Sequence, residues 1–399
     1  MIDILIAILI GIILGTITGL IPGIHTNLVA VTMLTLSAFL LNFISPLLIA
    51  IIIISMAITN TFLDVIPTIF LGAPDSSTAL AVLPGHRYLL DGKGYEAVIL
   101  TIIGSLGSLI LTIILIPLIT PLIGKIYPLL EDYIPYILIL VSVSLILREK
   151  ISKSFAFIIF LLAGILGIIT LTMPNLEEPL FPLLSGLFGT STLLISLNSQ
   201  TILPQQKTTY PKLNKKTTIK SLSTSVLVGS VASFLPGLGP SQAAIIGTQV
   251  YRKINLSGFL ILIGGLNTVN MVISFATLYI ISRARNGAVV TVSKILTEFQ
   301  IQHLILFLAI SLIAGGIATF LAINLAKTFS NTITKVNYQT LVLIIIALIM
   351  LLVLLISGFI GFLVLLTGTF IGILPSVKNI GKNHLMGCLL LPIILFFLI

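Results

Sequence analysis

The chain has 399 residues, of which 57% are hydrophobic and 8% are charged, and its mean hydropathy is +1.25. A soluble domain of this length would carry far more charge on its surface, so the composition excludes one. The formal net charge of +9 does not indicate nucleic-acid binding, because the basic residues sit in short loops between apolar runs, as membrane topology requires.

Apolar runs long enough to cross a bilayer fill most of the chain. In the first half they cover residues 2–21, 24–41, 46–72, 95–123, 133–147, 154–173 and 180–197. In the second half they cover residues 221–235, 241–251, 257–282, 301–326, 338–357, 358–374 and 385–398. We therefore predict an all-α polytopic protein that crosses the cell (plasma) membrane many times.

The first two apolar runs are interrupted by Pro22-Gly23. Proline removes a backbone donor and glycine permits a turn. Gly11, Gly15 and Gly19 precede this tip at four-residue spacing, which places small residues on one helix face and lets another helix approach closely. The alternative is that the motif only kinks a helix, since proline and glycine are common in membrane helices.

Polar side chains occur inside the apolar run 46–72. Asn60 and Thr61 bring amide and hydroxyl oxygens to membrane depth, and Asp64 follows one turn later. An intramembrane carboxylate is costly and indicates a functional site, here a cation ligand or a proton carrier. The alternatives are hydrogen bonding between helices for the Asn-Thr pair, and for Asp64 a water-filled surface or a basic partner.

The longest polar stretch is 198–220, which contains five lysines and reads as a linker. Its charge predicts a cytoplasmic position. We therefore divide the chain into an N-terminal transmembrane repeat (1–197), the cytoplasmic linker (198–220) and a C-terminal transmembrane repeat (221–399).

The second half begins with a second copy of the motif, Pro236-Gly237. Its ladder of small residues is Ser225, Gly229 and Ser233, in the same register as the first ladder. The basic loops fall on the cytoplasmic side if each motif forms a hairpin that is followed by about five membrane segments. The first hairpin then opens to the outside and the second opens to the inside. The two halves would then cross the membrane in opposite directions. Two broken helices at matching positions in such halves are typical of inverted-topology repeats in transporters.

A second Asn-Thr pair, Asn267-Thr268, occupies the segment after the second hairpin, and Asn270 follows one turn later. Hard cations such as Na⁺ prefer oxygen ligands, and helix breaks expose further carbonyls. The predicted ion-coupling residues are Asn60, Thr61, Asp64, Asn267, Thr268 and Asn270.

The two Pro-Gly motifs predict a binding site for an organic anion, because the N-terminus of a half-helix offers free N–H groups and a partial positive charge. The predicted substrate-binding residues are Pro22, Gly23, Thr26, Asn27, Pro236, Gly237, Gly239, Ser241 and Gln242. No catalytic residue, metal site or cofactor is expected, and the single cysteine, Cys388, excludes a Cys-based metal site. The alternative of a membrane-embedded enzyme or lipid-processing protein needs a convergent catalytic set, which the sequence does not show. A non-catalytic assembly subunit is a third alternative.

Five stretches of the chain carry a resemblance to a known family: Gly19–Asn27, Gly72–Gly94, Phe181–Thr190, Leu235–Ser241 and Gly368–Met386. With them the chain resembles the large permease subunit of the tripartite tricarboxylate transporter family, in its shorter, mostly archaeal branch. The resemblance spans nearly the whole chain. It implies a secondary transporter (permease) of carboxylates, often a symporter driven by an ion gradient.

Partners follow from the class and from the resemblance. A polytopic protein contacts the lipid bilayer, and its expected substrate is a small organic anion moved with Na⁺ or H⁺. In the full tripartite system an extracytoplasmic binding protein delivers substrate and a small membrane subunit assists. No nucleic acid is expected, and the sequence leaves the oligomeric state open, a homo-oligomer included.

Overall fold

The computed structural model describes residues 2–21, 26–73, 77–130, 133–174, 176–198, 204–234, 239–282, 284, 286–296, 298–333 and 338–398. Over these ranges the regular structure is helical throughout, as the composition predicted. The first half contains α1 (Ile2–Leu20), α2 (Thr26–Thr35), α3 (Ser37–Leu40), α4 (Pro46–Leu63), α5 (Val65–Phe70), η1 (Ala79–Ala81), α6 (Val82–Leu90), α7 (Gly94–Leu130), α8 (Ile134–Leu147), α9 (Lys153–Thr172), α10 (Leu180–Leu184), η3 (Ser185–Thr190) and α11 (Ser191–Asn198). The second half contains α12 (Lys215–Phe234), α13 (Pro240–Val250), α14 (Leu256–Ile281), α15 (Gly287–Ile295), α16 (Ile301–Ile333), α17 (Tyr338–Val377), η4 (Lys382–Met386) and α18 (Gly387–Leu398).

Within the described residues, seven helices are long and apolar enough to cross a membrane. Two of them are far more enclosed than the rest: the span Pro46–Phe70 is 83% buried and the span Leu256–Ile281 is 89% buried. The span Val342–Val377, by contrast, is only 28% buried. The centre of the molecule is therefore built from α4–α5 of one half and α14 of the other.

Glycine on α1 allows the close packing that the four-residue spacing predicted. A Cβ atom on Gly11 would lie 2.5 Å from the carbonyl oxygen of Ile52, and one on Gly15 would lie 2.5 Å from that of Met56. These contacts hold α1 directly against α4. In the second half α12 packs on α14 in the same way, and a Cβ on Gly229 would lie 2.8 Å from Cγ1 of Val269. Each small-residue ladder is thus a helix contact face.

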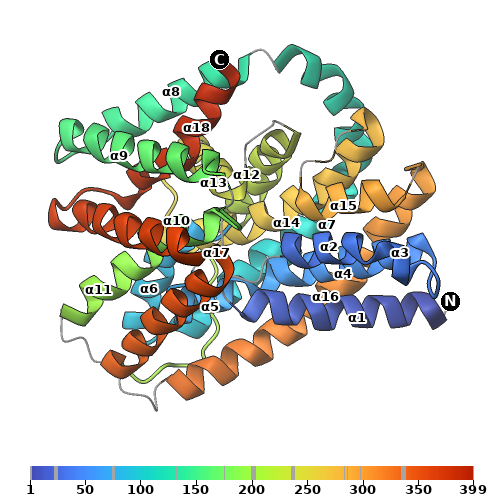
Figure 1. The fold of residues 1–399 in the computed structure, drawn as a ribbon, viewed down its shortest axis with the longest axis horizontal. Helices are drawn as coiled ribbons and strands as arrows, with labels where there is room; N and C mark the ends of the chain where they lie inside the picture. The colour runs from blue at the N-terminus through green and yellow to red at the C-terminus, as the bar shows by residue number, and fades with distance from the viewer. Residues whose placement is uncertain are drawn as a thin grey trace.

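The two halves interlock, because helices of each half pack on helices of the other. α7 packs on α14, α16 on α4, α9 on α18, and α17 on α10, η3 and α11. In Figure 1, α18 (red) lies beside α8 and α9 (green), and α16 (orange) runs alongside α1 and α4 (blue). Glycines make the outer crossings possible: a Cβ on Gly167 would overlap the carbonyl oxygen of Cys388, and one on Gly372 would overlap that of Leu187.

Two of the predicted segment boundaries fall within helices. The apolar runs 338–357 and 358–374 form one long helix, α17, which bends at Gly358, where φ is +66°. Glycine takes this backbone conformation without steric cost, so the bend falls at the predicted segment boundary. The end of the predicted linker is helical instead, because Oδ1 of Asn214 accepts the amides of Lys216 and Thr217 and caps α12.

The remainder of the linker is docked on the turn between α6 and α7. Gln206 is buried, and its Oε1 accepts the amide of Gly94 at 3.0 Å while its Nε2 donates to the carbonyl of Leu89 at 2.9 Å. The amide of Lys207 donates to the carbonyl of Gly92 at 2.8 Å. The described part of the linker therefore holds a defined position against the first half.

Candidate functional site at the crossing of α4 and α14

The central helix of the first half is interrupted at Asp64. Pro67 has no N–H, so it cannot bond the carbonyl of Leu63, and its ring crowds that carbonyl. α4 accordingly ends at Leu63 and α5 begins at Val65. Thr68 Oγ1 donates to the carbonyl of Asp64 at 2.9 Å and bridges the two helices.

The Asp64 carboxylate is buried, with 5% of the residue exposed, and two side chains donate to the same oxygen. Nδ2 of Asn267, on α14, lies 2.7 Å from Oδ2 of Asp64. Oγ of Ser77, in the turn before η1, lies 3.0 Å from that oxygen. Because a buried charge is costly unless it is hydrogen-bonded, these donors from distant segments stabilise the carboxylate where it stands.

One turn before Asp64, the two Asn-Thr pairs meet. Oγ1 of Thr61 lies 3.2 Å from Oγ1 of Thr268, and both residues are buried. Asn60 turns toward α1, where its Nδ2 donates to Oγ1 of Thr18 at 3.2 Å. The structure thus brings polar groups from α1, α4 and α14 together at the most enclosed crossing of the molecule.

Five of the six predicted ion-coupling residues belong to this cluster: Asn60, Thr61, Asp64, Asn267 and Thr268. Asn270 lies one turn further along α14 and is only partly buried; its carbonyl accepts Oγ of Ser274 at 2.7 Å. In the described part of the chain, no three His, Cys, Asp or Glu side chains gather to hold a metal ion. The oxygens of the cluster are instead the ligand type that suits Na⁺, and the carboxylate is also a proton acceptor.

The Pro-Gly tips are bracketed by helices on both sides. Pro22, Gly23, Pro236 and Gly237 lie outside the described residues, between the end of α1 and the start of α2 and between the end of α12 and the start of α13. α1 ends at Leu20, the described part of α12 runs to Phe234, and α13 begins at Pro240.

The predicted substrate-binding residues after the tips have different surroundings. Thr26 is half-buried and Asn27 is exposed, beside Gly287 of α15. Ser241 is buried in the first turn of α13. Oε1 of Gln242 accepts the amide of Gly239 at 3.0 Å, so this side chain caps the N-terminus of α13.

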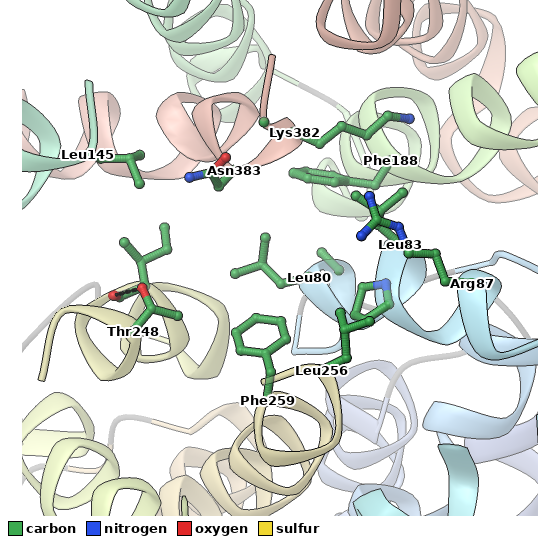
Figure 2. A pocket seen from close by; sticks show the side chains of 14 residues that line it. Leu80, Leu83, Arg87, Leu145, Phe188, Thr248, Leu256, Phe259, Lys382 and Asn383 are labelled. Atoms are coloured by element: carbon green, nitrogen blue, oxygen red, sulfur yellow. Dashed lines mark hydrogen bonds between the residues drawn. The ribbon is translucent and has the colours of Figure 1, made fainter. Parts of the chain in front are cut away.

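A separate cavity of about 370 Å³ lies between α6, α8, η3, α13, α14 and the turn before α18 (Figure 2). Its walls are mostly apolar, from Leu80, Leu83, Phe188 and Phe259 among others. Arg87 is exposed and reaches from α6 toward Phe188, while Thr248 and Asn383 lie on the opposite side in this view.

A second cation borders this cavity. Lys382 is buried, and its Nζ donates to Oγ1 of Thr192 at 2.7 Å and to Oγ of Ser191 at 3.3 Å. In Figure 2 its side chain extends along Phe188 with the ammonium at the far end. Burial, together with the positive charge of Lys382, lowers the pKa of His86 to about 4. The imidazole of His86 is therefore neutral at pH 7.

Arg87 and Lys382 were not among the functional residues predicted from the sequence. Both fall in stretches that carry the family resemblance, Gly72–Gly94 and Gly368–Met386. A lysine beside an apolar run is also a signal in its own right, since a buried ammonium needs polar partners. What the sequence could not show is that these stretches, far apart in the chain, line one cavity.

The sequence profile of the Tripartite tricarboxylate transporter TctA family matches residues 5–387. The chain belongs to the TctA family. A protein of Methanocaldococcus jannaschii, itself described as uncharacterized, is 32% identical over 381 residues, which is 93% of each chain. No solved structure matches. Membership in TctA, a family of transporter components, and the apolar helices together make this chain a multi-pass component of a membrane transport system.

Proposed function

We propose that this TctA-family chain is a secondary active transporter of small organic anions, chiefly carboxylates, driven by a Na⁺ or H⁺ gradient. The observation that carries the proposal is the hydrogen bond between Asp64 and Asn267. It joins the central helices of the two halves through a buried carboxylate. A driving cation or proton that binds this carboxylate would therefore act directly on the contact between the halves.

The proposed mechanism rests on an approximate two-fold relation between the halves. Thr61 and Thr268 each follow an asparagine in the segment after a Pro-Gly hairpin, so they are counterparts, and their hydroxyls touch. A residue that meets its own counterpart lies on or near a two-fold axis. Two further contacts are reciprocal in the same sense. Gly167 of α9 packs on Cys388 of α18 in the second half, and Gly372 of α17 packs on Leu187 of η3 in the first half.

In this proposal an inverted repeat explains alternating access. If the halves are related by an axis in the membrane plane, exchanging their conformations opens the central site to the other side. The half-helix termini at the Pro-Gly tips hold the substrate carboxylate, and the cluster at the α4–α14 crossing holds the cation. Neutralising Asp64, by Na⁺ or by a proton, weakens its hydrogen bond to Asn267 and favours the change.

The orientation and the partners are part of the same proposal. Arg87 and Lys382 line the cavity, and the basic loop 148–153 lies beside it, because Oε2 of Glu149 accepts the amide of Gly381. The lysine-rich linker contacts the turn after α6 through the hydrogen bond between Lys207 and Gly92. We assign this end to the cytoplasm, since membrane proteins carry excess Lys and Arg there. By family analogy, an extracytoplasmic binding protein and a small membrane subunit then act from the opposite face and within the membrane.

Uptake into proteoliposomes tests the function. The purified chain is reconstituted, and radiolabelled di- and tricarboxylates are offered under an inward Na⁺ gradient, an inward H⁺ gradient or neither. We expect accumulation with one of the gradients, and loss of the gradient effect in Asp64→Asn. The matched control is Glu96→Gln, which removes a carboxylate outside the cluster. Organic anions that never accumulate, under any gradient and with the accessory subunits present, would refute the proposal.

A further inference from the structure

We infer that the 370 Å³ cavity between η1, α6, α8, η3, α13, α14 and η4 is a binding site for an amphipathic anion, with one anionic head group and a hydrocarbon body, separate from the α4–α14 cluster. The inference does not depend on the proposed transport function. It rests on the lining of the cavity, on the sign of its charge and on its size.

The walls favour a ligand that is mostly hydrocarbon. Leu80, Leu83, Phe188 and Phe259 come from four different elements and face the same space (Figure 2). Removing an apolar group from water against such walls is favourable, in proportion to the apolar area that is buried. A di- or tricarboxylate would have to surrender water around several charges there without replacement partners, which is costly.

The edge of the cavity favours a negative head group. Two cations, Arg87 and Lys382, contribute to the lining, and no carboxylate does so among the described residues. Lys382 is engaged with Ser191 and Thr192, so it supplies a positive field. Arg87 is exposed and lies at one end of the cavity, where its planar guanidinium can pair two oxygens of a carboxylate or phosphate. We therefore assign the head group to Arg87.

The size of the cavity suits a compact ligand. Its volume of about 370 Å³ lies at the small end of the range for ligand pockets, roughly 300–1,000 Å³, and decanoate is a compact ligand of the required chemistry. Two sources share this chemistry: a free medium-chain carboxylate, and an anionic membrane lipid that inserts part of one acyl chain.

The absence of tryptophan from the sequence permits a clean binding measurement. Phe259→Trp places a single fluorophore in the cavity wall, and Phe188→Trp is a second reporter if the first variant does not fold. The protein is held in phosphatidylcholine nanodiscs and titrated with 10-bromodecanoate, whose bromine quenches tryptophan only on contact. We expect saturable quenching that decanoate reverses and succinate does not.

Two further variants separate specific binding from partition into lipid. Arg87→Gln, made in the Phe259→Trp background, should raise the half-saturating concentration at least about tenfold, because it removes a charge-assisted hydrogen bond. Phe370→Trp is the control, since residue 370 is 70% exposed on the outer surface of α17. Its quenching should rise without saturation and ignore Arg87→Gln.

The lipid source has its own arm. In nanodiscs with bromine-labelled phosphatidylglycerol, quenching of the Phe259→Trp reporter that depends on Arg87 and resists decanoate would identify a lipid as the occupant. Non-saturable quenching in both arms, or quenching unchanged by Arg87→Gln, would overturn the inference. Because no transport is measured, failure here leaves the proposed function untouched, and failure of uptake leaves this site untouched.

Discussion

Asn267 donates a hydrogen bond of 2.7 Å to the carboxylate of Asp64, 203 residues earlier in the chain. The two residues lie on the two most enclosed membrane spans, one from each half. A side-chain amide that donates to a buried carboxylate is sensitive to whether that carboxylate is charged. A change in the charge of Asp64 would therefore alter a contact between the two halves.

Exchanging the two side chains should preserve this contact. In the double variant Asp64→Asn, Asn267→Asp, an amide still faces a carboxylate, so we expect the free energy of unfolding to stay within about 1 kcal/mol of wild type. Asn267→Asp alone sets two carboxylates at hydrogen-bond distance, where both cannot ionise, and should be clearly less stable. Thermal unfolding in detergent measures both. Equal stability of the single and double variants would mean that the contact does not form.

If the cluster binds the driving cation, as we propose, substitutions in it should change the cation dependence of uptake. Asn60→Ala and Asn267→Ala each remove a polar group from the crossing, and we expect both to raise the cation concentration that gives half-maximal uptake. Proteoliposome assays over a series of Na⁺ concentrations and pH values provide the measurement. If neither ion affects wild-type uptake, these residues serve only to join helices.

The contact between Thr61 and Thr268 can be tested by cross-linking. Their hydroxyl oxygens are 3.2 Å apart, so cysteines at both positions fall near disulfide distance. In a Cys388→Ser background, Thr61→Cys with Thr268→Cys should oxidise to one intramolecular disulfide, visible as a mass loss of about 2 Da and a shift on non-reducing gels. Thr61→Cys paired with Thr319→Cys on α16 is the control. Cross-linking equal to that of the control would contradict the described crossing.

Two glycines should respond differently to replacement by alanine. A Cβ on Gly15 would lie 2.5 Å from the carbonyl oxygen of Met56, whereas a Cβ on Gly316 meets nothing within 4 Å. Gly15→Ala should therefore destabilise the protein by about 1–3 kcal/mol through overpacking. Gly316→Ala should be neutral or stabilise by up to about 1 kcal/mol, because alanine favours helix. Thermal unfolding of both variants decides, and a destabilised Gly316→Ala would count against the packing of α16.

Stability should fall with pH below 6.5, in part through His86. Its pKa is lowered to about 4, so the unfolded chain binds a proton at higher pH than the folded chain does. Its contribution is present above pH 6.5 and is lost as the pH falls toward 4, by about 3 kcal/mol in total. His86→Gln cannot titrate, so it should lose less stability than wild type between pH 7 and pH 4. Parallel unfolding curves for the two proteins across that range would disprove this.

The proposed orientation predicts which surfaces a membrane-impermeant thiol reagent can reach. Tyr210 in the linker is 69% exposed and Phe43, before α4, is 72% exposed. In a Cys388→Ser background, Tyr210→Cys should react only after the cells are opened, and Phe43→Cys should react in intact cells. The reverse pattern would invert the topology and move the cavity to the outside.

The sequence by itself determined the features that depend on local spacing. Composition required an all-helical membrane protein, the first Pro-Gly motif lies just after the end of α1, and the ladder of Gly11, Gly15 and Gly19 predicted a helix contact face. Each follows from backbone chemistry within a few residues: a missing N–H, an absent Cβ, or a four-residue helical repeat. The run 46–72 likewise showed that Asp64 was costly to bury.

Only the tertiary structure decided which residues meet. Nothing local pairs Asp64 with Asn267 or Thr61 with Thr268, because the partner of a membrane helix depends on how all the helices pack. Asn270, one turn from Asn267, faces a less enclosed environment for the same reason. The cavity could not be predicted from the sequence. Its lining residues Arg87, Phe188, Phe259 and Lys382 belong to four separate elements, which share a surface only after the two halves interlock.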